Sequence, residues 1–544
     1  MPEPMVRNIF SRRAFLSSAL SAGAALTLPY PQGSALAQSR RETLRHVTGG
    51  AINTLDPTML GSTRESFGLS MNVYDRLMTF GSRPIGAFAT FDPAHLQGEL
   101  AESCEISADQ RRLTLHLRDN AVWHDGTPVV AEDIKWSLDR CVSANSLARP
   151  QFSSGSLTTP DQFRIAGERT IEISLPKPDR LAMANLAMPY AIMVNSRLAR
   201  QHATSDDPWA QQWLQHNTAA GGAFRVENFR PGVNVTLTRD NGWHSGAAPF
   251  FQRIISQTVP EATTRAGLIE RGDADIVIDL EAYDIMALSR RGKVHIDSVV
   301  ESNCFTHLAF NTQSAPFDNV LVRRAIALAL PYQDLFAASI FGRGKPLYGA
   351  DWSERSPAPD FPQPLPFSQN VQKAREMLMK AGHPDGFHTT FSYATSQTTT
   401  AEPMAALIQE ALGHIGITVR IDKLPDAQFN TMQARRQLDF YTDTAAGWIE
   451  HAYYFFYLYF TRDQRWNFSN WNSPQMVELV EKARFETDEA AYVAECQGML
   501  DLLVDQVPLI LLWQPNMDAV TVPDLTGFTY QYYRQVDFRT LARS

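Results

Sequence analysis

Cysteine is scarce in this 544-residue sequence, and no cysteine has the spacing of a metal ligand. Cys104, Cys141, Cys304 and Cys496 lie far apart, and the sequence contains no C-x-x-C pair. This pattern argues against a zinc site. Each cysteine lies among apolar residues, where a buried thiol is the usual role. In a compartment that permits disulfides, Cys104 and Cys141 are the pair to test first, because the segments that carry them are close in sequence.

Positive charge, long hydrophobic runs and familiar catalytic motifs are lacking as well. Asp and Glu number 58 against 49 Lys and Arg, and this net charge of −9 argues against nucleic-acid binding. After residue 37, no segment has the roughly 20 apolar residues that span a bilayer. The sequence contains no G-x-S-x-G, H-E-x-x-H or G-x-x-x-x-G-K-[ST]; the nearest approach to the last, Gly342 to Lys345, is followed by Pro346. We therefore expect no enzyme, no metal and no cofactor.

Residues 1–37 are predicted to be an export signal and not part of the fold. Ser11 to Leu16 (SRRAFL) contains a twin-arginine pair followed by apolar residues, and a mildly apolar run continues to Leu28. Ala35-Leu36-Ala37 supplies the small residues of a cleavage site. No cysteine follows it, so a lipid anchor is not indicated. The sequence predicts a soluble periplasmic protein, exported by the twin-arginine pathway and cleaved near Ala37.

Residues 113–140 have the pattern of a strand, a turn and a helix. Leu113, Leu115 and Leu117 alternate with polar residues, which is the period of a half-buried strand. Asp125 to Pro128 (DGTP) has the composition of a turn. A helix is expected to follow, with two acidic residues in its first turn, where they face the positive end of the helix dipole. By themselves these patterns indicate an α/β protein.

The same segment also resembles a family fingerprint. Trp123 to Pro128 (WHDGTP) and Ala131 to Leu138 (AEDIKWSL) match almost letter for letter the signature of the extracytoplasmic solute-binding proteins of peptide-type ABC importers, family 5. Other segments resemble the family's motifs in the family's order, over nearly the whole chain after the signal. These segments are residues 53–57 (NTLDP), 222–226 (GAFRV), 239–243 (RDNGW), 310–325 (beginning FNT and ending VRRA) and 506–508 (QVP).

The resemblance implies an α/β fold of the periplasmic-binding-protein class, with two hinge-connected lobes, a ligand cleft between them and an extra subdomain. Lobe I would combine residues 43–64, 220–305 and 511–544, the extra subdomain would be 65–219, and lobe II would be 306–510. The residue pattern agrees with this class, because apolar stripes over 371–381 and 403–414 predict helices and the alternation over 417–421 predicts a strand. Closure of two lobes would remove water from a ligand between them.

The resemblance places one wall of the cleft at the segment GWIEHAY. In the peptide-binding members, the aspartate of a G-W-x-x-D motif holds the amino terminus of the peptide. Here that position is His451, next to Glu450, and a neutral imidazole cannot replace a carboxylate as the partner of an ammonium group. We therefore expect a ligand with an acceptor or an anionic group instead of an ordinary peptide. The predicted ligand-lining residues of this segment are Gly447, Trp448, Ile449, Glu450, His451 and Tyr453.

The resemblance places the facing wall in the loop after residues 53–57. The family's residues at that distance run beside the ligand, and here they are Ser62, Thr63 and Arg64. Thr63 would offer hydrogen bonds, and Arg64 a fork for a carboxylate or phosphate; a solvated arginine on a loop is the alternative. Trp352, in a loop rich in Gly and Pro, is a weaker candidate.

The function that this resemblance implies is that of a periplasmic receptor for an ABC importer. Such a receptor captures a small solute, peptide-like or of another organic class, and delivers it to permease subunits in the inner membrane. We expect a monomer with no nucleic-acid partner. Two alternatives stay open: a secreted hydrolase, which would need a nucleophile or paired carboxylates facing the cleft, and a periplasmic chaperone or haem-delivery protein.

Overall fold

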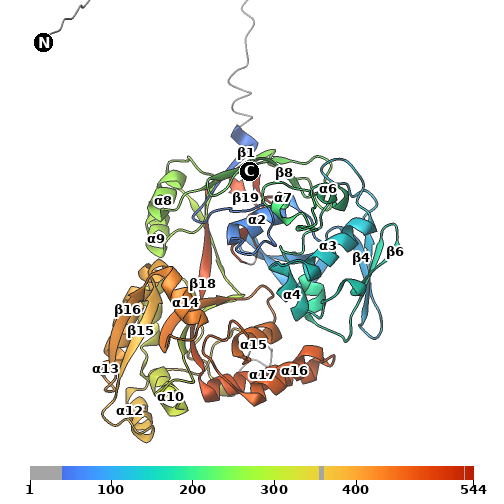
Figure 1. Ribbon diagram of the computed structural model, residues 1–544. Coiled ribbons are helices and arrows are strands. Elements are labelled where there is room, and N and C mark those ends of the chain that lie inside the picture. The colour runs from blue at the N-terminus through green and yellow to red at the C-terminus, as the bar shows by residue number, and fades with distance from the viewer. Residues whose placement is uncertain (1–39, 355–359, 463, 532) are drawn as a thin grey trace, which may run out of the picture. The chain divides into compact units, whose positions relative to one another are not determined.

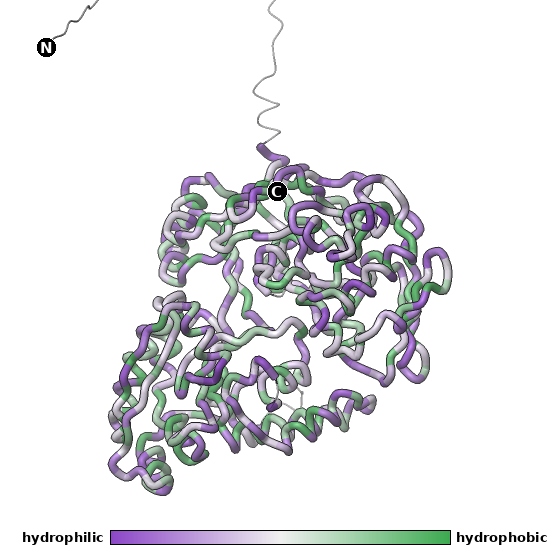
Figure 2. Tube along the Cα trace, viewed as in Figure 1, coloured by the Kyte–Doolittle hydropathy of each residue, from purple (hydrophilic) through white to green (hydrophobic). Residues whose placement is uncertain are grey.

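The computed structural model describes residues 40–354, 360–462, 464–531 and 533–544. The predicted signal peptide, residues 1–37, lies outside the described residues. Residues 41–544 form one compact unit. Among the described residues, no helix is both long and apolar enough to cross a bilayer. Figure 2 shows apolar and polar residues interspersed along the chain, as expected where each element buries only one face.

The largest sheet contains two groups of strands that share one long strand, β18 (Leu509–Thr521). The first group is β1 (Thr43–Thr48), β8 (Phe224–Arg230), β9 (Asn234–Arg239), β10 (Arg253–Thr258), β11 (Ile276–Val277) and β12 (His295–Val300). The second group is β13 (Cys304–Phe310), β14 (Gly344–Pro346), β15 (His388–Ala394), β16 (Thr418–Leu424) and β17 (Phe440–Ala446).

Strand β18 connects the two groups by pairing with each of them along a different part of its length. Near its start, Ile510 is the antiparallel partner of Leu308 in β13, and near its end Val520 is the partner of Ile296 in β12. Figure 1 shows β18 running from the second group to the first. Relative motion of the two groups would therefore have to be absorbed at this shared strand and at the short link between β12 and β13.

The remaining strands of the described residues form three smaller sheets. One contains β4 (Ala101–Ile106), β5 (Arg112–Leu117), β6 (Phe163–Gly167) and β7 (Thr170–Ser174). Another contains β2 (Met78–Ile85), β3 (Phe88–Gly98), β20 (Thr529–Gln531) and β21 (Gln535–Val536), and the last contains β19 (Leu525–Thr526) and β22 (Ala542–Arg543). The hairpin of β20 and β21 ties the C-terminal part of the chain to β3, which is more than 400 positions earlier in the sequence.

The fingerprint segment folds as predicted, and its polar residues have structural roles. β5 buries all three leucines of the alternating pattern. Helix α3 (Ala131–Ser143) follows the turn, and Asp133 in its first turn is fully buried. One oxygen of Asp133 accepts a hydrogen bond from Trp123 Nε1 (3.0 Å), and the other accepts one from Ser196 Oγ (2.6 Å). The fingerprint thus fixes a strand, a turn and a helix to one another.

Helices cover the sheets, as the alternation of helices and strands predicted. The remaining α-helices are α2 (Arg64–Val73), α4 (Ala148–Ser154), α5 (Leu181–Asn185), α6 (Ser196–Arg200), α7 (Gln211–Leu214), α8 (Ala262–Glu270), α9 (Ala282–Arg291), α10 (Val320–Ala329), α11 (Tyr332–Ile340), α12 (Val371–Lys380), α13 (Thr398–Gly413), α14 (Asp426–Ala434), α15 (Ala452–Phe460), α16 (Pro474–Phe485) and α17 (Glu489–Gln506). α12 matches its predicted stripe closely. α13 starts earlier than the predicted Pro403, because Ala401 and Met404 are buried and their packing carries the helix through the proline.

All four cysteines are free thiols. Cys104 Sγ lies 3.9 Å from Met183 Sδ, and Cys141 Sγ points instead to the carbonyl oxygen of Tyr190 (3.9 Å). Burial raises the pKa of Cys104 to about 11 and that of Cys141 to about 12. The disulfide that the sequence left open between Cys104 and Cys141 is therefore absent, because the two side chains point to different partners.

Candidate functional site

A cavity of about 800 Å³ lies between the two groups of strands. Its walls come from β13, β17 and the start of α13 in the second group and from the segments after β1 and β11 in the first group; β18 and the loop between β20 and β21 contribute as well. Its charged lining residues are Arg64, Arg265, Arg343, Arg534, Asp279, Glu281, Glu301 and Asp518. Every positive group of this lining is an arginine, a residue suited to binding carboxylates and phosphates with paired hydrogen bonds.

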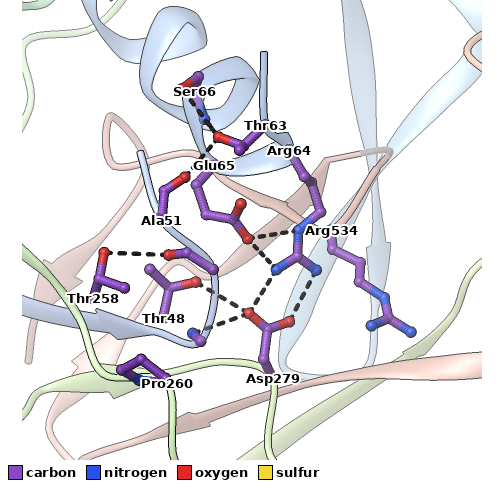
Figure 3. A network of polar contacts seen from close by, with 12 residues as sticks. Thr48, Ala51, Thr63, Arg64, Glu65, Ser66, Thr258, Pro260, Asp279 and Arg534 are labelled. Atoms are coloured by element: carbon purple, nitrogen blue, oxygen red, sulfur yellow. Dashed lines mark hydrogen bonds and ion pairs between the residues drawn. The ribbon is translucent and has the colours of Figure 1, made fainter. Parts of the chain in front are cut away.

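Arg64 lines this cavity and is held by a carboxylate (Figure 3). Its Nη1 donates to Asp279 Oδ1 (2.9 Å) and its Nη2 to Asp279 Oδ2 (2.6 Å), while Nε donates to Glu65 Oε1 (3.0 Å). Thr48 Oγ1 donates to the same aspartate (3.0 Å). Burial alone would raise the pKa of Asp279, but the Arg64 guanidinium lowers it well below its usual range. Arg64 is therefore a fixed charge with most of its donors already used.

Thr63 and Ser62, which precede Arg64, do not line this cavity. Thr63 is the N-cap of α2: its hydroxyl accepts from the backbone N–H of Ser66 and donates to the carbonyl oxygen of Ala51 (2.6 Å). Ser62 Oγ is buried and has no hydrogen-bond partner among the described residues. Thr63 therefore positions Arg64 indirectly. As the N-cap it fixes where α2 begins, and Arg64 is the first residue of that helix.

Arg534 differs from Arg64 because most of its guanidinium is unpartnered among the described residues. Nε donates to Glu301 Oε1, and neither Nη1 nor Nη2 has a hydrogen-bond partner there. The side chain is 37 % exposed and lines the cavity. Arg534 and the preceding Tyr533 both have positive φ, +57° and +68°. A left-handed backbone costs about 1–3 kcal/mol at each residue, and such strain is concentrated at functional sites.

The other two arginines of the cavity have partners. Arg343 is paired with Asp518 and donates through Nη2 to Ser298 Oγ (2.8 Å). Arg265 donates to main-chain carbonyl oxygens, those of Val259 and Pro260 at 2.7 Å. These two guanidinium groups therefore help to hold the walls in place.

The part of the wall formed by β13, β17 and the start of α13 carries no charged side chain. The polar lining residues of this wall are Thr306, Ser396, Gln397, Thr399, Thr400, Thr442 and Thr444. Four of them belong to the first turn of α13 or precede it directly, so that the helix begins at the cavity. The first backbone N–H groups of an α-helix have no partner within the helix and favour anions. The cavity thus places arginines opposite hydroxyls and a helix N-terminus.

A second cavity, of about 230 Å³, adjoins the first one. Thr444, Ala446 and Tyr533 line both cavities, and Trp448 lines only the second. The rings of Trp448 and Tyr533 stack, with centroids 4.1 Å apart and an angle of 2° between planes. The structure therefore places Trp448, a predicted ligand-lining residue, at the junction of the two cavities.

The other residues predicted around Trp448 do not line either cavity. His451 Nδ1 lies 2.9 Å from the Tyr492 hydroxyl, and burial, with the nearby charge of Arg180, lowers the pKa of His451 to about 4. Glu450 accepts a hydrogen bond from Ser302, and burial raises its pKa. Gly447 and Ile449 are also buried, as is Tyr453, with 1 % of its surface exposed.

Trp352, predicted as a weaker candidate, also lies outside both cavities. Its Nε1 donates to Asp501 Oδ1 (3.2 Å) on α17.

Gly447 has a packing role, because a Cβ atom there would lie 2.8 Å from the Phe455 ring. Arg64 and Trp448 are thus the predicted positions that line the two cavities.

The comparisons with known proteins agree with this architecture. The model of the bacterial extracellular solute-binding proteins, family 5 (middle part), matches residues 95–467. The chain belongs to this family.

Two relatives and one solved structure illustrate the family. The probable D,D-dipeptide-binding periplasmic protein DdpA of Escherichia coli K12 is 27% identical over 447 residues, 80% of this chain and 82% of DdpA. Heme-binding protein A of Haemophilus influenzae is 27% identical over 405 residues, 70% of each chain. The structure of the PBP AgaA from A. tumefacien R10, in complex with agropinic acid, has a TM-score of 0.73 at 24% identity and covers 92% of this chain and 99% of AgaA.

Membership of this solute-binding family confirms two predictions from the sequence. The two-lobe α/β periplasmic-binding-protein fold is confirmed by the solved structures that share it. The role as substrate-binding receptor of an ABC importer is supported over the hydrolase, chaperone and haem-delivery alternatives. Relatives with periplasmic names support a periplasmic location.

Several residues that line the cavity of about 800 Å³ leave no clear signal in the sequence. Tyr533 and Arg534 lie in a short loop between strands of two or three residues, which leave no periodic pattern. Asp279 follows β11, a strand of only two residues, which also leaves no periodic pattern in the sequence. The run TSQTTT at Thr395–Thr400, by contrast, is a concentration of hydroxyl groups at the start of a helix, and this signal is visible in the sequence.

Proposed function

We propose that this receptor captures a small solute with a carboxylate group, and that Arg534 binds this carboxylate in the cavity of about 800 Å³. The single observation that carries the proposal is the pair of Arg534 Nη groups, which lie in the cavity wall without partners among the described residues. A guanidinium with both Nη groups free can bind a carboxylate with two parallel hydrogen bonds.

The surroundings of Arg534 support an anionic group over a neutral one. Glu301 neutralises its charge only through Nε, whereas Asp279 occupies two nitrogens of Arg64. The N-terminus of α13 faces the same cavity and adds a favourable potential for an anion. The volume suits a ligand of drug-like size, for which pockets of about 300–1,000 Å³ are usual.

The proposed contact set revises the one predicted from the sequence. Arg534 and the hydroxyl-bearing wall of β17 and α13 bind the anionic part of the ligand, and Arg64 contributes through its remaining Nη1 hydrogen. Trp448 and Tyr533 border the ligand with their aromatic rings. Thr63 positions Arg64 as the N-cap of α2, and Ser62 and Thr63 do not contact the ligand in this proposal. His451 is a buried neutral residue in this proposal and not the anchor.

The proposal includes a binding cycle without turnover. The two groups of strands close on the solute, the complex docks on the permease subunits in the inner membrane, and the solute is released there unchanged. The receptor is a monomer, exported by the twin-arginine pathway and cleaved near Ala37. Replacement of Arg12 and Arg13 by Lys is expected to retain the unprocessed chain in the cytoplasm, and the mature N-terminus can be read by mass spectrometry.

The test is a thermal-shift screen followed by calorimetry with carboxylates and their matching carboxamides. The panel contains D-alanyl-D-alanine, glutathione and agropinic acid, with haem and a neutral sugar as probes of other ligand classes. We expect the hits to be carboxylates that lose affinity at least about tenfold as amides, the size of a charge-assisted pair. A neutral sugar as the tightest ligand would overturn the proposal, and conversion of a hit to product would overturn the absence of turnover.

A further inference from the structure

The second cavity, of about 230 Å³, is separated from the first one by strand β17. Successive side chains of a strand point to opposite faces. Accordingly Thr442 lines the first cavity alone, while Asp443 lines the second alone. The two cavities meet at the end of this strand, where Ala446 and Tyr533 line both. Arg534, which follows Tyr533 in sequence, therefore lies next to the residues that the two cavities share.

Six aromatic residues contribute to the lining of the second cavity. The aromatic lining residues are Trp448, Tyr454, Tyr459, Trp466, Phe468 and Tyr533. The Tyr454 hydroxyl donates to Gln151 Oε1 (2.7 Å), and the Tyr459 hydroxyl donates to the carbonyl oxygen of Ala446 (2.9 Å). These bonds fix the two rings, so that the lining is preorganised. Ring faces attract cations by about 0.5–2 kcal/mol.

Asp443 is the carboxylate in the lining of the second cavity. Its Oδ1 accepts from Gln397 Nε2 (3.1 Å) and from its neighbour's backbone N–H (2.7 Å), and its Oδ2 accepts from Gln433 Nε2 (2.6 Å). No lysine, arginine or histidine of the described residues forms an ion pair with it. In the first cavity, by contrast, Asp279, Glu301 and Asp518 are each paired with an arginine. The Asp443 carboxylate is therefore held by neutral donors alone, and a cationic ligand group could form an ion pair with it.

His307 adds an unpartnered ring nitrogen to the same wall. It is the cross-strand partner of Asp443, lines the second cavity and is 5 % exposed. Burial lowers the pKa of His307, so the imidazole is neutral at pH 7 although the carboxylate of Asp443 opposes this effect. Its Nδ1 atom is buried and has no hydrogen-bond partner among the described residues. A ligand N–H group could supply that missing partner.

We propose that the second cavity binds a cationic group of the ligand, between the Asp443 carboxylate, the His307 imidazole and the aromatic rings. The inference rests on the proposed function, because the same ligand binds Arg534 through its carboxylate. The receptor then selects zwitterionic solutes that carry a carboxylate at one end and an alkylammonium or guanidinium group at the other. The opposite charges of the two subsites also fix the direction in which such a solute binds.

The test uses three probes with one scaffold and different distal groups: N-acetyl-L-lysine, N-acetyl-L-norleucine and N-acetyl-L-2-aminoadipate. All three carry the carboxylate for Arg534, and their distal groups are cationic, neutral and anionic. By calorimetry with the full mature chain, we expect the lysine derivative to bind about tenfold more tightly than the norleucine derivative, and the aminoadipate derivative to bind most weakly. Asp443→Asn should bring the lysine and norleucine derivatives within about twofold of each other.

Two further variants separate recognition from folding. Asp443→Glu keeps the charge and should keep the preference for lysine, and Asp439→Asn, just before β17 and exposed, should leave all three affinities unchanged. An unchanged lysine preference in Asp443→Asn, or equal binding of the lysine and norleucine derivatives by the wild type, overturns the cation subsite alone. Failure of all three carboxylates to bind the wild type contradicts the proposed carboxylate site, and the cation subsite with it.

Discussion

The ring of Tyr533 lies flat on the ring of Trp448, with centroids 4.1 Å apart and planes inclined by 2°. Trp448 follows β17, and Tyr533 comes from the hairpin loop near the C-terminus, 85 positions later in sequence. The rings of Phe67 and Tyr190 also make edge-to-face contacts with Trp448, at centroid distances of 4.6 and 5.6 Å. One indole therefore brings together four segments that are distant in sequence, at the point where the two cavities meet.

Trp448 should therefore affect ligand binding more than an ordinary surface tryptophan does. We expect Trp448→Leu to weaken binding of a carboxylate ligand about tenfold or more, because it removes a buried aromatic wall of the kind that dominates binding energies. Calorimetry gives the comparison. Trp352→Leu is the matched control, because Trp352 lies outside both cavities and should leave the affinity within about twofold. Equal losses in the two variants would contradict the role of the Trp448–Tyr533 stack.

The pair of Arg64 and Asp279 should stabilise the fold in a pH-dependent way. The folded protein lowers the pKa of Asp279, so the stabilisation is complete above the unfolded value near 4 and is lost as the pH falls below it. We expect Asp279→Asn to cost about 1–3 kcal/mol at pH 7. Urea unfolding at pH 7, 4 and 3 should show this cost shrinking as the pH falls. A cost that is the same at all three pH values would contradict the ion-pair account.

His451 should make the fold less stable in mild acid. The folded protein lowers its pKa from 6.5 to about 4, so between these values the unfolded chain binds a proton that the folded protein does not. Stability is therefore lost as the pH falls from about 6.5 to about 4, and the slope vanishes below that. His451→Gln removes this titration and should flatten the curve of unfolding free energy between pH 7 and 4.5. A variant with the wild-type slope would show that His451 titrates normally.

Contacts outside the cavities also connect the segment 65–219 with α16 and α17. Arg484 Nε lies 3.4 Å from Asp179 Oδ2 and Arg484 Nη2 lies 3.2 Å from the carbonyl oxygen of Ser153, while Arg180 pairs with Glu489 at 2.8 Å. Such contacts stabilise the arrangement in which these two parts of the chain lie together, and they do not touch either cavity. We expect Arg484→Gln to weaken ligand binding by about two- to tenfold, mainly through faster dissociation in stopped-flow measurements. Lys482→Gln, an exposed charge on the same helix, serves as control, and an equal effect there would exclude a specific role for Arg484.

The sequence predicted the framework better than the site, for a physical reason. The strand, turn and helix around Trp123 are determined by local periodicity and by the hydrogen bond from Trp123 to Asp133, and both are contained within one short segment. The cavity depends on contacts between segments far apart, such as Arg64 with Asp279 and Trp448 with Tyr533. His451 shows the same limit. Its spacing from Gly447 indicates the family, but its hydrogen bond with Tyr492, 41 positions later, cannot be predicted from the sequence.

The most direct test of the account measures binding of D-alanyl-D-alanine and of its carboxamide by calorimetry to the wild type, to Arg534→Gln and to Arg253→Gln. Arg253 is an exposed, paired arginine on β10 and controls for the lost charge. If Arg534 binds the carboxylate, the wild type and Arg253→Gln should bind the carboxylate at least about tenfold more tightly than the amide, and Arg534→Gln should bind the two forms equally. A carboxylate preference that survives in Arg534→Gln would contradict this role of Arg534.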